Sequence, residues 1–550
     1  MENKQQNSMS GLFPVIDDIP GEIRLPQPLY QRQILINGQL QDWDGPTHLV
    51  TSPVFVKHNK DGKAEPFMIG SYPLATEKEA NDALEAALSA FDHGRGQWPS
   101  MYMQERVDCL EDFLVKMKAK REEVVRLLVW EIGKTVPDAE KEFDRTVEYI
   151  YETVKAASRL RNKNSAIICA NDFIGHSTKV PFGVVLCMGP FNYPLNETFT
   201  TLIPALIMGN TILFKPPKHG TLLFAPLLDA FAESFPAGVV NTVYGRGRDI
   251  VPTLMESGKV DVLALIGSSK VADSLKKMHP KSNRLKAILG LDAKNAAIIL
   301  ADADLDNAVR ESVAGALSFN GQRCTALKIL FVHRDIVEEF NQRLIYAVNQ
   351  LKVGMPWTKG VNITPLAEPA KPAYLKDVIG DALSHGAQVI NRTDDEEDSF
   401  ESIVKPAIVY PVNKNMRLYH EEQFGPVIPV VPFEDLDMPV SFISNSPYGQ
   451  QVSIFSGDTK KIAYLIDTLN GEVGRININV QCQRGPDSFA FNGRKDSAAG
   501  TLSIDEALLA FSTDSVIATK QSDANSKIFE TILAENQSKR LNSQSTVCPF

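Results

Sequence analysis

The chain has 550 residues, of which 43% are hydrophobic, and a formal net charge of -10. This length exceeds what one ordinary hydrophobic core organises, so two or three domains are expected. The acidic balance argues against a nucleic-acid partner, because a negative chain gains nothing from the phosphate backbone.

The N-terminal residues, MENKQQNSMSGLF, contain no basic run followed by an apolar core and therefore predict no secretory signal. No apolar stretch reaches the roughly 20 residues that cross a bilayer, so no membrane segment is expected. The six cysteines show no C-x-x-C spacing, which indicates neither a metal site nor a disulfide framework. Together these features favour a reducing cytoplasm.

The first third of the chain predicts a surface segment followed by helices. Residues 1–43 are rich in Pro, Gln and Gly and are expected to wrap the surface. Apolar residues then recur at helical spacing in three segments. These segments are Glu77–Phe91, Gln104–Met117 and Arg121–Ile132, with Gly133 as a stop for the last one.

From residue 183 onward, short apolar strands alternate with helical segments. Strand patterns occupy 183–189, 211–216, 238–245 and 260–269, and helical patterns occupy Glu197–Met208, Leu222–Ser234 and Asp249–Glu256. This alternation predicts a parallel, doubly wound sheet that binds ligands at the carboxyl ends of its strands.

A second series predicts another α/β domain. It has strands within 296–306, 328–333, 387–391, 404–412 and 427–433, and a helix over Leu305–Phe319. The polar residues 521–550 are expected to form a surface tail.

Cys324, in FNGQRCTALK, is the candidate nucleophile. Small and polar residues surround it where a core cysteine would have apolar neighbours. Arg323 adjoins it, and a nearby cation lowers a thiol pKa. The alternative interpretation is a buried structural thiol.

Four further motifs contain candidate site residues. Asn192, in MGPFNYPLN, is either a turn asparagine or an amide for a developing oxyanion. Lys215 ends the strand of ILFKPPKHG and is either solvated or a dinucleotide ligand. Gly267 and Ser268 join a strand to a helix whose free N–H groups can receive a pyrophosphate. Glu422, in EEQFGPV, is alone most often a solvated residue at a helix boundary.

Together and in this order, these segments resemble the aldehyde dehydrogenase superfamily over about residues 50–520. The resemblance implies an α/β fold with a Rossmann-like cofactor domain, an α/β catalytic domain and a small β oligomerisation segment that builds a homodimer or homotetramer. The implied divisions are an N-terminal extension (1–29), a cofactor domain (30–162 and 182–292), a catalytic domain (293–496), oligomerisation segments (163–181 and 497–520) and a tail (521–550).

The resemblance also implies a role for each motif. Cys324 attacks an aldehyde to give a thiohemiacetal, Asn192 stabilises its oxyanion, and hydride transfer to the nicotinamide leaves a thioester that water hydrolyses. The implied cofactor contacts are Lys215, Gly267, Ser268, Glu422 and Phe424.

Lys218 predicts the choice of cofactor. Relatives that prefer NAD usually carry a glutamate three residues after the position of Lys215, and here that residue is Lys218. An ammonium attracts a 2′-phosphate that a carboxylate repels, so we expect NADP to be preferred, with NAD possible.

A narrower likeness predicts the substrate. QCQRGPDSFAFNGRKDS resembles the non-phosphorylating glyceraldehyde-3-phosphate dehydrogenase branch, in which a tyrosine and arginines bind the substrate phosphate. The matching residues are Tyr193, Arg323, Arg484 and Arg145. Cations converging on one dianion suit this role, although Arg484 and Arg145 have structural salt bridges as their alternative. Another semialdehyde is the alternative substrate.

One position departs from the family. The usual general base is the glutamate of L-E-L-G-G-K, and the matching position of LGLDAKN holds Gly290. Three accounts remain open. Asp292 or Glu422 activates water, coenzyme A accepts the acyl group, or hydrolysis is slow and the chain is a weak enzyme or a non-catalytic protein of this fold.

Overall fold

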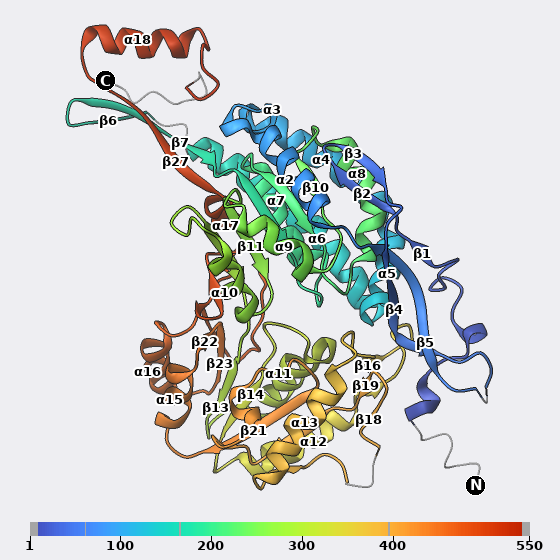
Figure 1. Ribbon diagram of the computed structural model, residues 1–550. Helices are drawn as coiled ribbons and strands as arrows, with labels where there is room; N and C mark the ends of the chain where they lie inside the picture. Colours follow the sequence, from blue (N-terminus) through green and yellow to red (C-terminus); the bar gives the residue numbers. More distant parts are fainter. Residues whose placement is uncertain (1–8, 61, 164–166, 394–396, 542–550) are drawn as a thin grey trace.

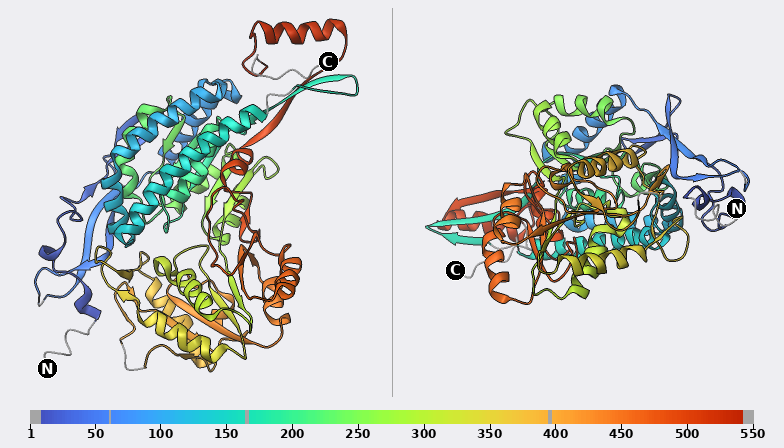
Figure 2. Two further views of the ribbon diagram at one scale, coloured as in Figure 1. Left: turned by 180° about the vertical axis from the view of Figure 1, so that it is seen from behind. Right: turned by 90° about the horizontal axis from the view of Figure 1, so that it is seen from below.

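The computed structural model describes residues 9–60, 62–163, 167–393 and 397–541. Two lobes, each built on a mostly parallel sheet with helices around it, lie one above the other, and an arm of three strands projects from the upper lobe (Figure 1). This arrangement confirms the predicted α/β class. The view from behind shows the long helix α6, Val136–Lys163, running down the upper lobe towards the lower one (Figure 2).

The upper lobe contains a six-stranded sheet in the order β10-β9-β8-β11-β12-β26. Its first five strands are parallel, and β26 pairs antiparallel with β12. Four of these strands lie where alternating apolar segments predicted them, whereas β12 was not predicted. The bounds are β8 Val184–Met188, β9 Thr211–Lys215, β10 Val240–Thr242, β11 Val262–Ile266, β12 Lys286–Gly290 and β26 Ala498–Ala499.

Helices of the upper lobe pack on this sheet through small apolar faces. In α2, Glu77–Phe91, the side chains of Ala80, Ala83, Leu84 and Ala87 are buried, while Thr76 and Glu79 form a capping box at its start. The other helices are α3 Gln97–Ser100, α4 Met103–Ala119, α5 Arg121–Ile132, α7 Asn196–Ile207, α8 Leu228–Ser234, α9 Gly247–Glu256, α10 Ser269–Met278 and α17 Ile504–Ala510.

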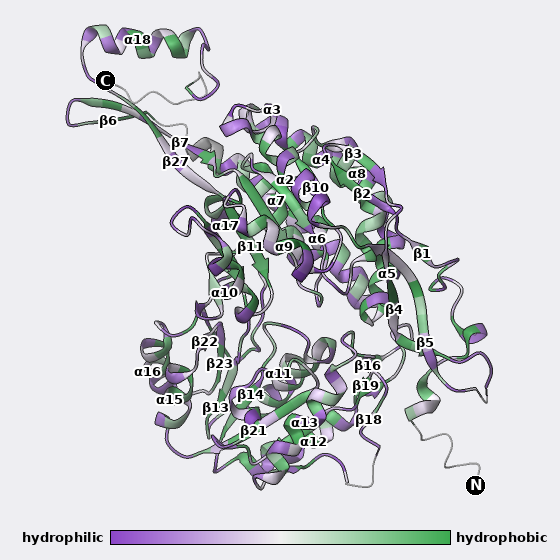
Figure 3. Ribbon diagram, viewed as in Figure 1, coloured by the Kyte–Doolittle hydropathy of each residue, from purple (hydrophilic) through white to green (hydrophobic). Residues whose placement is uncertain are grey.

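The lower lobe contains a seven-stranded sheet in the order β17-β20-β21-β14-β13-β23-β24. Its strands are parallel except for β17, and the hydrophobic residues concentrate along them (Figure 3). The strands are β13 Ala296–Ile299, β14 Ile329–His333, β17 Gln388–Val389, β20 Ala407–Tyr410, β21 Val427–Phe433, β23 Gln451–Phe455 and β24 Arg475–Ile478. The helices are α11 Leu305–Leu317, α12 Val337–Asn349, α13 Lys371–Ser384, α14 Arg417–His420, α15 Asp437–Asn445 and α16 Thr459–Leu469.

The N-terminal segment is more deeply packed than a surface wrap. Met9, Phe13, Ile19 and Ile23 are buried in the main core, and the ring of Phe13 lies 5.5 Å from that of Phe55. The strands that follow this segment are β1 Leu29–Tyr30, β2 Gln33–Ile36, β3 Gln39–Asp42, β4 Thr47–Val56 and β5 Glu65–Pro73. Elsewhere, two-residue and three-residue strands form small pairs, which are β15 Lys352–Val353 with β16 Val361–Ile363, β18 Ser399–Phe400 with β19 Ile403–Val404, and β22 Tyr448–Gly449 with β25 Arg494–Lys495.

The arm is a three-stranded antiparallel sheet in the order β27-β7-β6 (Figure 1). Its strands are β6 Ile167–Ala170, β7 Phe173–Pro181 and β27 Ser512–Lys520. The segment expected to pair with 163–181 therefore does so only over 512–520, since residues 498–511 contribute β26 and α17 to the body.

Within the expected surface tail, Asp523–Ala534 forms helix α18. Phe529 and Leu533 of this helix are buried against Ile167 and Ile174 of the arm, because they recur at i and i+4 on one face. Within the described ranges, no helix is long and apolar enough to span a membrane.

Candidate active site

A cavity of about 630 Å³ lies between the two lobes and collects the predicted site residues. Its walls come from the carboxyl ends of β8, β9, β11 and β12 and from the loops before β14 and β21. Ten of its lining residues matter here, and they are Asn192, Tyr193, Glu197, Lys215, Lys218, Gly267, Ser268, Cys324, Glu422 and Phe424. The structure therefore brings nine of the predicted site residues into the lining of one cavity, and Arg145, Arg323 and Arg484 are not part of that lining.

The turn that presents Cys324 requires an unusual backbone. Phe319 and Asn320 have φ values of 49° and 57°, and Gly321 follows with a φ of 71°. A Cβ on Gly321 would lie 2.6 Å from the carbonyl oxygen of Gly425, so only glycine fits this position. This turn between α11 and β14 brings Cys324 to the cavity.

The carbonyl oxygen of Cys324 is fixed by two side chains. Asn295 Nδ2 and Lys328 Nζ each donate a hydrogen bond to it at 2.8 Å. Lys328, whose side chain is 1% exposed, also lies 2.6 Å from Glu422 Oε1. This network links the nucleophile to the loop that carries Glu422.

Burial raises the pKa of the Cys324 thiol, and the negative charge of Glu197 raises it further, while Lys328 and Arg484 act in the opposite direction. The expectation that Arg323 favours the thiolate is therefore wrong. Arg323 Nη2 instead donates to the carbonyl oxygens of Ala314 and Gly315 at the end of α11.

Asn192 lies next to the Cys324 turn. It is buried, and its Nδ2 donates to the carbonyl oxygen of Gln322 at 2.8 Å. The connection from β8 to α7 thus carries a side-chain amide to Cys324, the candidate nucleophile, where it could serve a developing oxyanion.

Cations line the upper-lobe wall of the cavity. Lys215 is buried, donates to the carbonyl oxygen of Pro216 at 2.7 Å, and has its pKa lowered to about 8 by burial. Lys218 is exposed. The neighbouring His219 is different, because its burial, with smaller effects of Lys218 and His48, lowers its pKa to about 4. Lys215 and Lys218 suit a ligand that carries phosphate groups.

The start of α10 is partly occupied by a carboxylate. Ser268 caps this helix by accepting from Val271 N, and Asp292 Oδ2 accepts from Ser269 N at 2.7 Å and from Ser269 Oγ at 2.8 Å. A helix start of this kind binds anions, so Asp292 lies where a pyrophosphate would be received.

The residues of the cavity otherwise fit a phosphorylated dinucleotide. Two lysines lie at one wall, and Glu422 and Phe424 lie at the other. Phe424 has a φ of 46°, and its ring lies 5.8 Å from that of Phe191. Lys215 and Lys218 would hold phosphate, and Glu422 would accept hydrogen bonds from a ribose.

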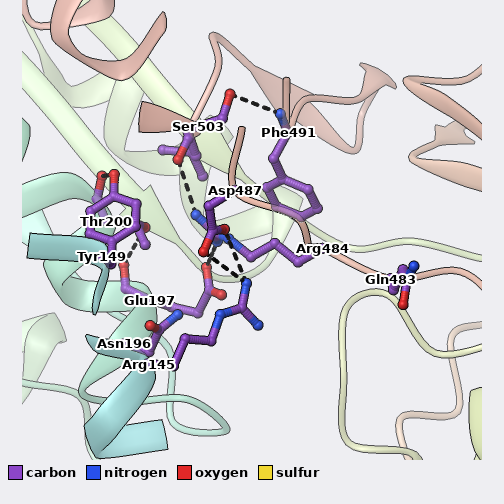
Figure 4. A network of polar contacts seen from close by, with 12 residues as sticks. Arg145, Tyr149, Asn196, Glu197, Thr200, Gln483, Arg484, Asp487, Phe491 and Ser503 are labelled. Carbon is purple, nitrogen blue, oxygen red and sulfur yellow. Dashed lines mark hydrogen bonds and ion pairs between the residues drawn. The ribbon is translucent and has the colours of Figure 1, made fainter. Parts of the chain in front are cut away.

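The predicted phosphate-binding arginines lie in a network of ion pairs (Figure 4). Arg145 Nη2 contacts Asp487 Oδ1 at 3.0 Å, and Arg484 Nε contacts the same oxygen at 3.3 Å. Arg484 Nη1 also pairs with Glu197. Arg145 and Arg484 thus lie together in salt bridges with carboxylates of the chain itself, which is the structural alternative considered for them, and Arg323 is not part of this network.

Tyr193 lines the cavity beside a buried cation. Lys134 Nζ lies 3.4 Å from the centre of the Tyr193 ring and also pairs with Glu142. Burial of its hydroxyl raises the pKa of Tyr193, so this group remains a neutral hydrogen-bond donor at neutral pH.

Sequence reasoning missed three site residues: Glu197, Lys328 and Asn295. Glu197 follows Asn192 by five residues within a motif already singled out, and an acidic residue at a helix start was the available signal. Asn295 carried no such signal, because its contact depends on the approach of β13 to the Cys324 turn. Lys328 follows Cys324 by only four residues in the same motif, but its pairing with Glu422 joins distant parts of the chain. Within the part of the chain that the structure describes, no group of three His, Cys, Asp or Glu side chains could hold a metal.

Comparison with known proteins agrees with this geometry. The model of the aldehyde dehydrogenase family matches residues 62–517. The chain therefore belongs to the aldehyde dehydrogenase family, whose members are oxidoreductases that act on aldehydes.

More specific similarity points to one group of relatives. The chain is 32% identical over 450 residues to an NADP-dependent glyceraldehyde-3-phosphate dehydrogenase of Streptococcus equinus, covering 81% of this chain and 92% of the relative. A malonate-semialdehyde dehydrogenase of Bacillus cereus is 28% identical and covers 79% and 88%. The crystal structure of NADP-dependent glyceraldehyde-3-phosphate dehydrogenase from Bacillus halodurans, complexed with NADP, aligns with a TM-score of 0.81, 30% identity and coverage of 90% and 100%.

Proposed function

We propose that this protein oxidises an aldehyde to a carboxylic acid with NADP, and that glyceraldehyde 3-phosphate is its substrate. The observation that carries the proposal is that Cys324, Asn192, Lys215 and Glu422 line one cavity between two α/β lobes. The named relatives support both the cofactor and the substrate.

The residues at Cys324 divide the work of the reaction. The sulfur forms a bond to the aldehyde carbon, and Asn192 Nδ2 turns from the Gln322 carbonyl to the new oxyanion. NADP, when bound, accepts the hydride from that carbon, which leaves a thioester on Cys324. Water then forms the acid and releases the thiolate.

Charge supports NADP over NAD. Lys218 is exposed beside the cavity, and Lys215 stands at the carboxyl end of β9. Two cations on one wall stabilise the additional 2′-phosphate, whereas a carboxylate at 218 would repel it.

The substrate phosphate has a candidate position at Arg145. This arginine lines a separate cavity of about 380 Å³ together with Asp487, and its side chain is 31% exposed. A phosphate dianion can therefore reach Arg145 from outside, and it competes with Asp487 for the guanidinium. Arg484 lies behind this pair, closer to Cys324.

A substrate panel tests the proposal. Three aldehydes are compared with NADP: glyceraldehyde 3-phosphate, unphosphorylated glyceraldehyde and malonate semialdehyde. Glyceraldehyde 3-phosphate should give the highest kcat/KM. Arg145→Ala should raise the KM for the phosphorylated aldehyde about tenfold or more and leave that of glyceraldehyde nearly unchanged, since a lost charge-assisted contact is worth about 1.5–3 kcal/mol. A higher kcat/KM for malonate semialdehyde would overturn the substrate assignment.

Gly290 supports a second candidate, in which coenzyme A takes the acyl group from Cys324. This position carries no carboxyl group to activate water. Adding coenzyme A to a reaction in progress should then accelerate NADPH formation and yield an acyl thioester. An unchanged rate with free acid as the product would exclude this candidate.

A further inference from the structure

Hydrolysis of a thioester at Cys324 needs a group that takes a proton from water, and Gly290 cannot supply it. Four carboxylates line the cavity that contains Cys324. They are Glu197, Asp292, Glu368 and Glu422. The contacts of each carboxylate decide which one is available to a thioester.

All four carboxylates have a partner, but the other three act on the Cys324 thiol less than Glu197 does. Both contacts of Asp292 Oδ2 go to Ser269, on the upper-lobe wall that suits the dinucleotide. Glu422 lies 2.6 Å from the buried Lys328. Glu368 is paired with Lys371 at 3.1 Å.

Glu197 has a different position. It lies in the first turn of α7, five residues after Asn192, and its backbone N donates to the carbonyl oxygen of Tyr193. It is buried, and among the charged neighbours of Cys324 it has the largest effect on the thiol. The connection that brings the oxyanion amide to Cys324 therefore brings a carboxylate as well.

Arg484 fixes the direction of the Glu197 side chain. Arg484 Nη1 pairs with Oε2 of Glu197 (Figure 4), and Arg484 Nη2 donates to the carbonyl oxygen of Leu502 at 3.0 Å. Both partners are buried. A guanidinium anchored to the backbone leaves the carboxylate one orientation, with its other oxygen available to a water molecule.

We infer that Glu197 is the general base for hydrolysis of the Cys324 thioester, in place of the residue missing at 290. The inference rests on the thioester chemistry proposed above. A carboxylate oxygen of Glu197 accepts a proton from water as the water oxygen bonds to the acyl carbon. Collapse of the tetrahedral adduct breaks the C–S bond, Cys324 leaves as thiolate, and the proton on Glu197 passes to solvent.

An activated ester tests this step without the aldehyde or the cofactor. p-Nitrophenyl acetate acylates a thiol and releases p-nitrophenolate, so a burst reports acylation and the later steady rate reports hydrolysis of the acetyl-enzyme. Glu197→Gln keeps the shape and the contact with Arg484 but cannot take a proton. We expect its burst to remain and its steady rate to fall about 10²-fold or more.

Two controls separate catalysis from damage to the fold. Glu111→Gln makes the same change on an exposed carboxylate of α4 and should keep both phases of wild type. Hydroxylamine, a stronger nucleophile than water, should release the acetyl group from the Glu197→Gln enzyme as a hydroxamate at close to the wild-type rate.

The outcomes decide between assignments. A steady rate within threefold of wild type in Glu197→Gln, or burst-only behaviour in Asp292→Asn instead, would overturn the inference. Loss of the burst itself in Glu197→Gln also overturns it, since the residue would then serve acylation. If wild type hydrolyses the ester through Glu197 but fails to oxidise glyceraldehyde 3-phosphate with NADP, only the proposed function fails.

Discussion

At the scale of single residues, Cys324 combines a reactive position with an unfavourable environment for charge. Burial and Glu197 raise its thiol pKa, so little thiolate exists in the free protein at neutral pH. The chemistry therefore depends on what enters the cavity, since a cationic group or a proton acceptor close to the sulfur is needed to favour the thiolate.

This environment predicts a steep pH dependence of alkylation. The rate of iodoacetamide modification at Cys324, followed by mass spectrometry of its peptide, should rise about tenfold per pH unit from 7 to 8 and continue to rise beyond 9. The exposed Cys169 in the same sample should react faster at pH 7. A plateau for Cys324 below pH 8 would contradict the raised pKa.

Lys218 should determine the preference between the two cofactors. Lys218→Glu replaces an attractive charge with a repulsive one beside the site of the 2′-phosphate, so the ratio of kcat/KM for NADP to that for NAD should fall by about tenfold or more. Lys259→Glu, a similar exchange on a surface lysine paired with Glu85, should leave the ratio unchanged. Equal ratios in wild type and Lys218→Glu would remove the charge argument.

At the scale of elements, the start of α10 carries a carboxylate that competes with an anionic ligand. Asp292→Asn retains an acceptor for Ser269 but removes the negative charge. NADP should then bind about three- to tenfold more tightly, which corresponds to roughly 1 kcal/mol for one charge near a pyrophosphate. Calorimetric titration measures this, and unchanged or weaker binding would show that Asp292 moves aside at no cost.

The turn between α11 and β14 should be intolerant of a methyl group. Gly321→Ala places a Cβ 2.6 Å from the Gly425 carbonyl oxygen at a φ of 71°. The free energy of unfolding should drop by about 1–3 kcal/mol in a urea titration. Gly380→Ala, on the exposed side of α13 with nothing near its Cβ, should be neutral or stabilising.

The elements that sequence predicted best are those with a local signal. Helices α2 and α5 have the predicted bounds, because a capping box begins α2 and Gly133, with a φ of 72°, ends α5. Helix α6 and strand β12 were not predicted, since α6 is largely polar and β12 has only a short apolar run before Gly290.

The candidate site shows the same division. Asn192 and Ser268 follow strand ends and Lys215 ends β9, whereas Cys324 and Glu422 lie in the connections before β14 and β21. The pairing of Glu197 with Arg484 joins residues 287 positions apart, so no local pattern could reveal it. The same holds for the hydrogen bond from Asn295 to the Cys324 carbonyl oxygen, which needs β13 and β14 to lie side by side.

At the scale of the whole molecule, the arm carries exposed apolar side chains. Ile168, Phe173 and Val516 are 60%, 48% and 66% exposed, whereas α18 covers other arm residues through Phe529 and Leu533. Strand β27 is also an edge of its sheet. A long exposed edge strand beside apolar side chains pairs with another chain or is otherwise protected.

We therefore predict that two copies associate through the arm, as the family resemblance implied. Wild type should elute as a dimer or tetramer in size-exclusion chromatography with light scattering. Val516→Asp places a charge in the predicted contact and should lower the mass to that of a smaller species, while Val115→Asp, at a 70% exposed position of α4, should not. A monomeric wild type, or an unchanged mass in Val516→Asp, would mean that the arm serves another contact.

The arm is also connected to the upper lobe. Its strand β27 directly follows α17, and α17 packs on α6 and α7. Dissociation of the arms should therefore also lower the temperature at which the upper lobe unfolds.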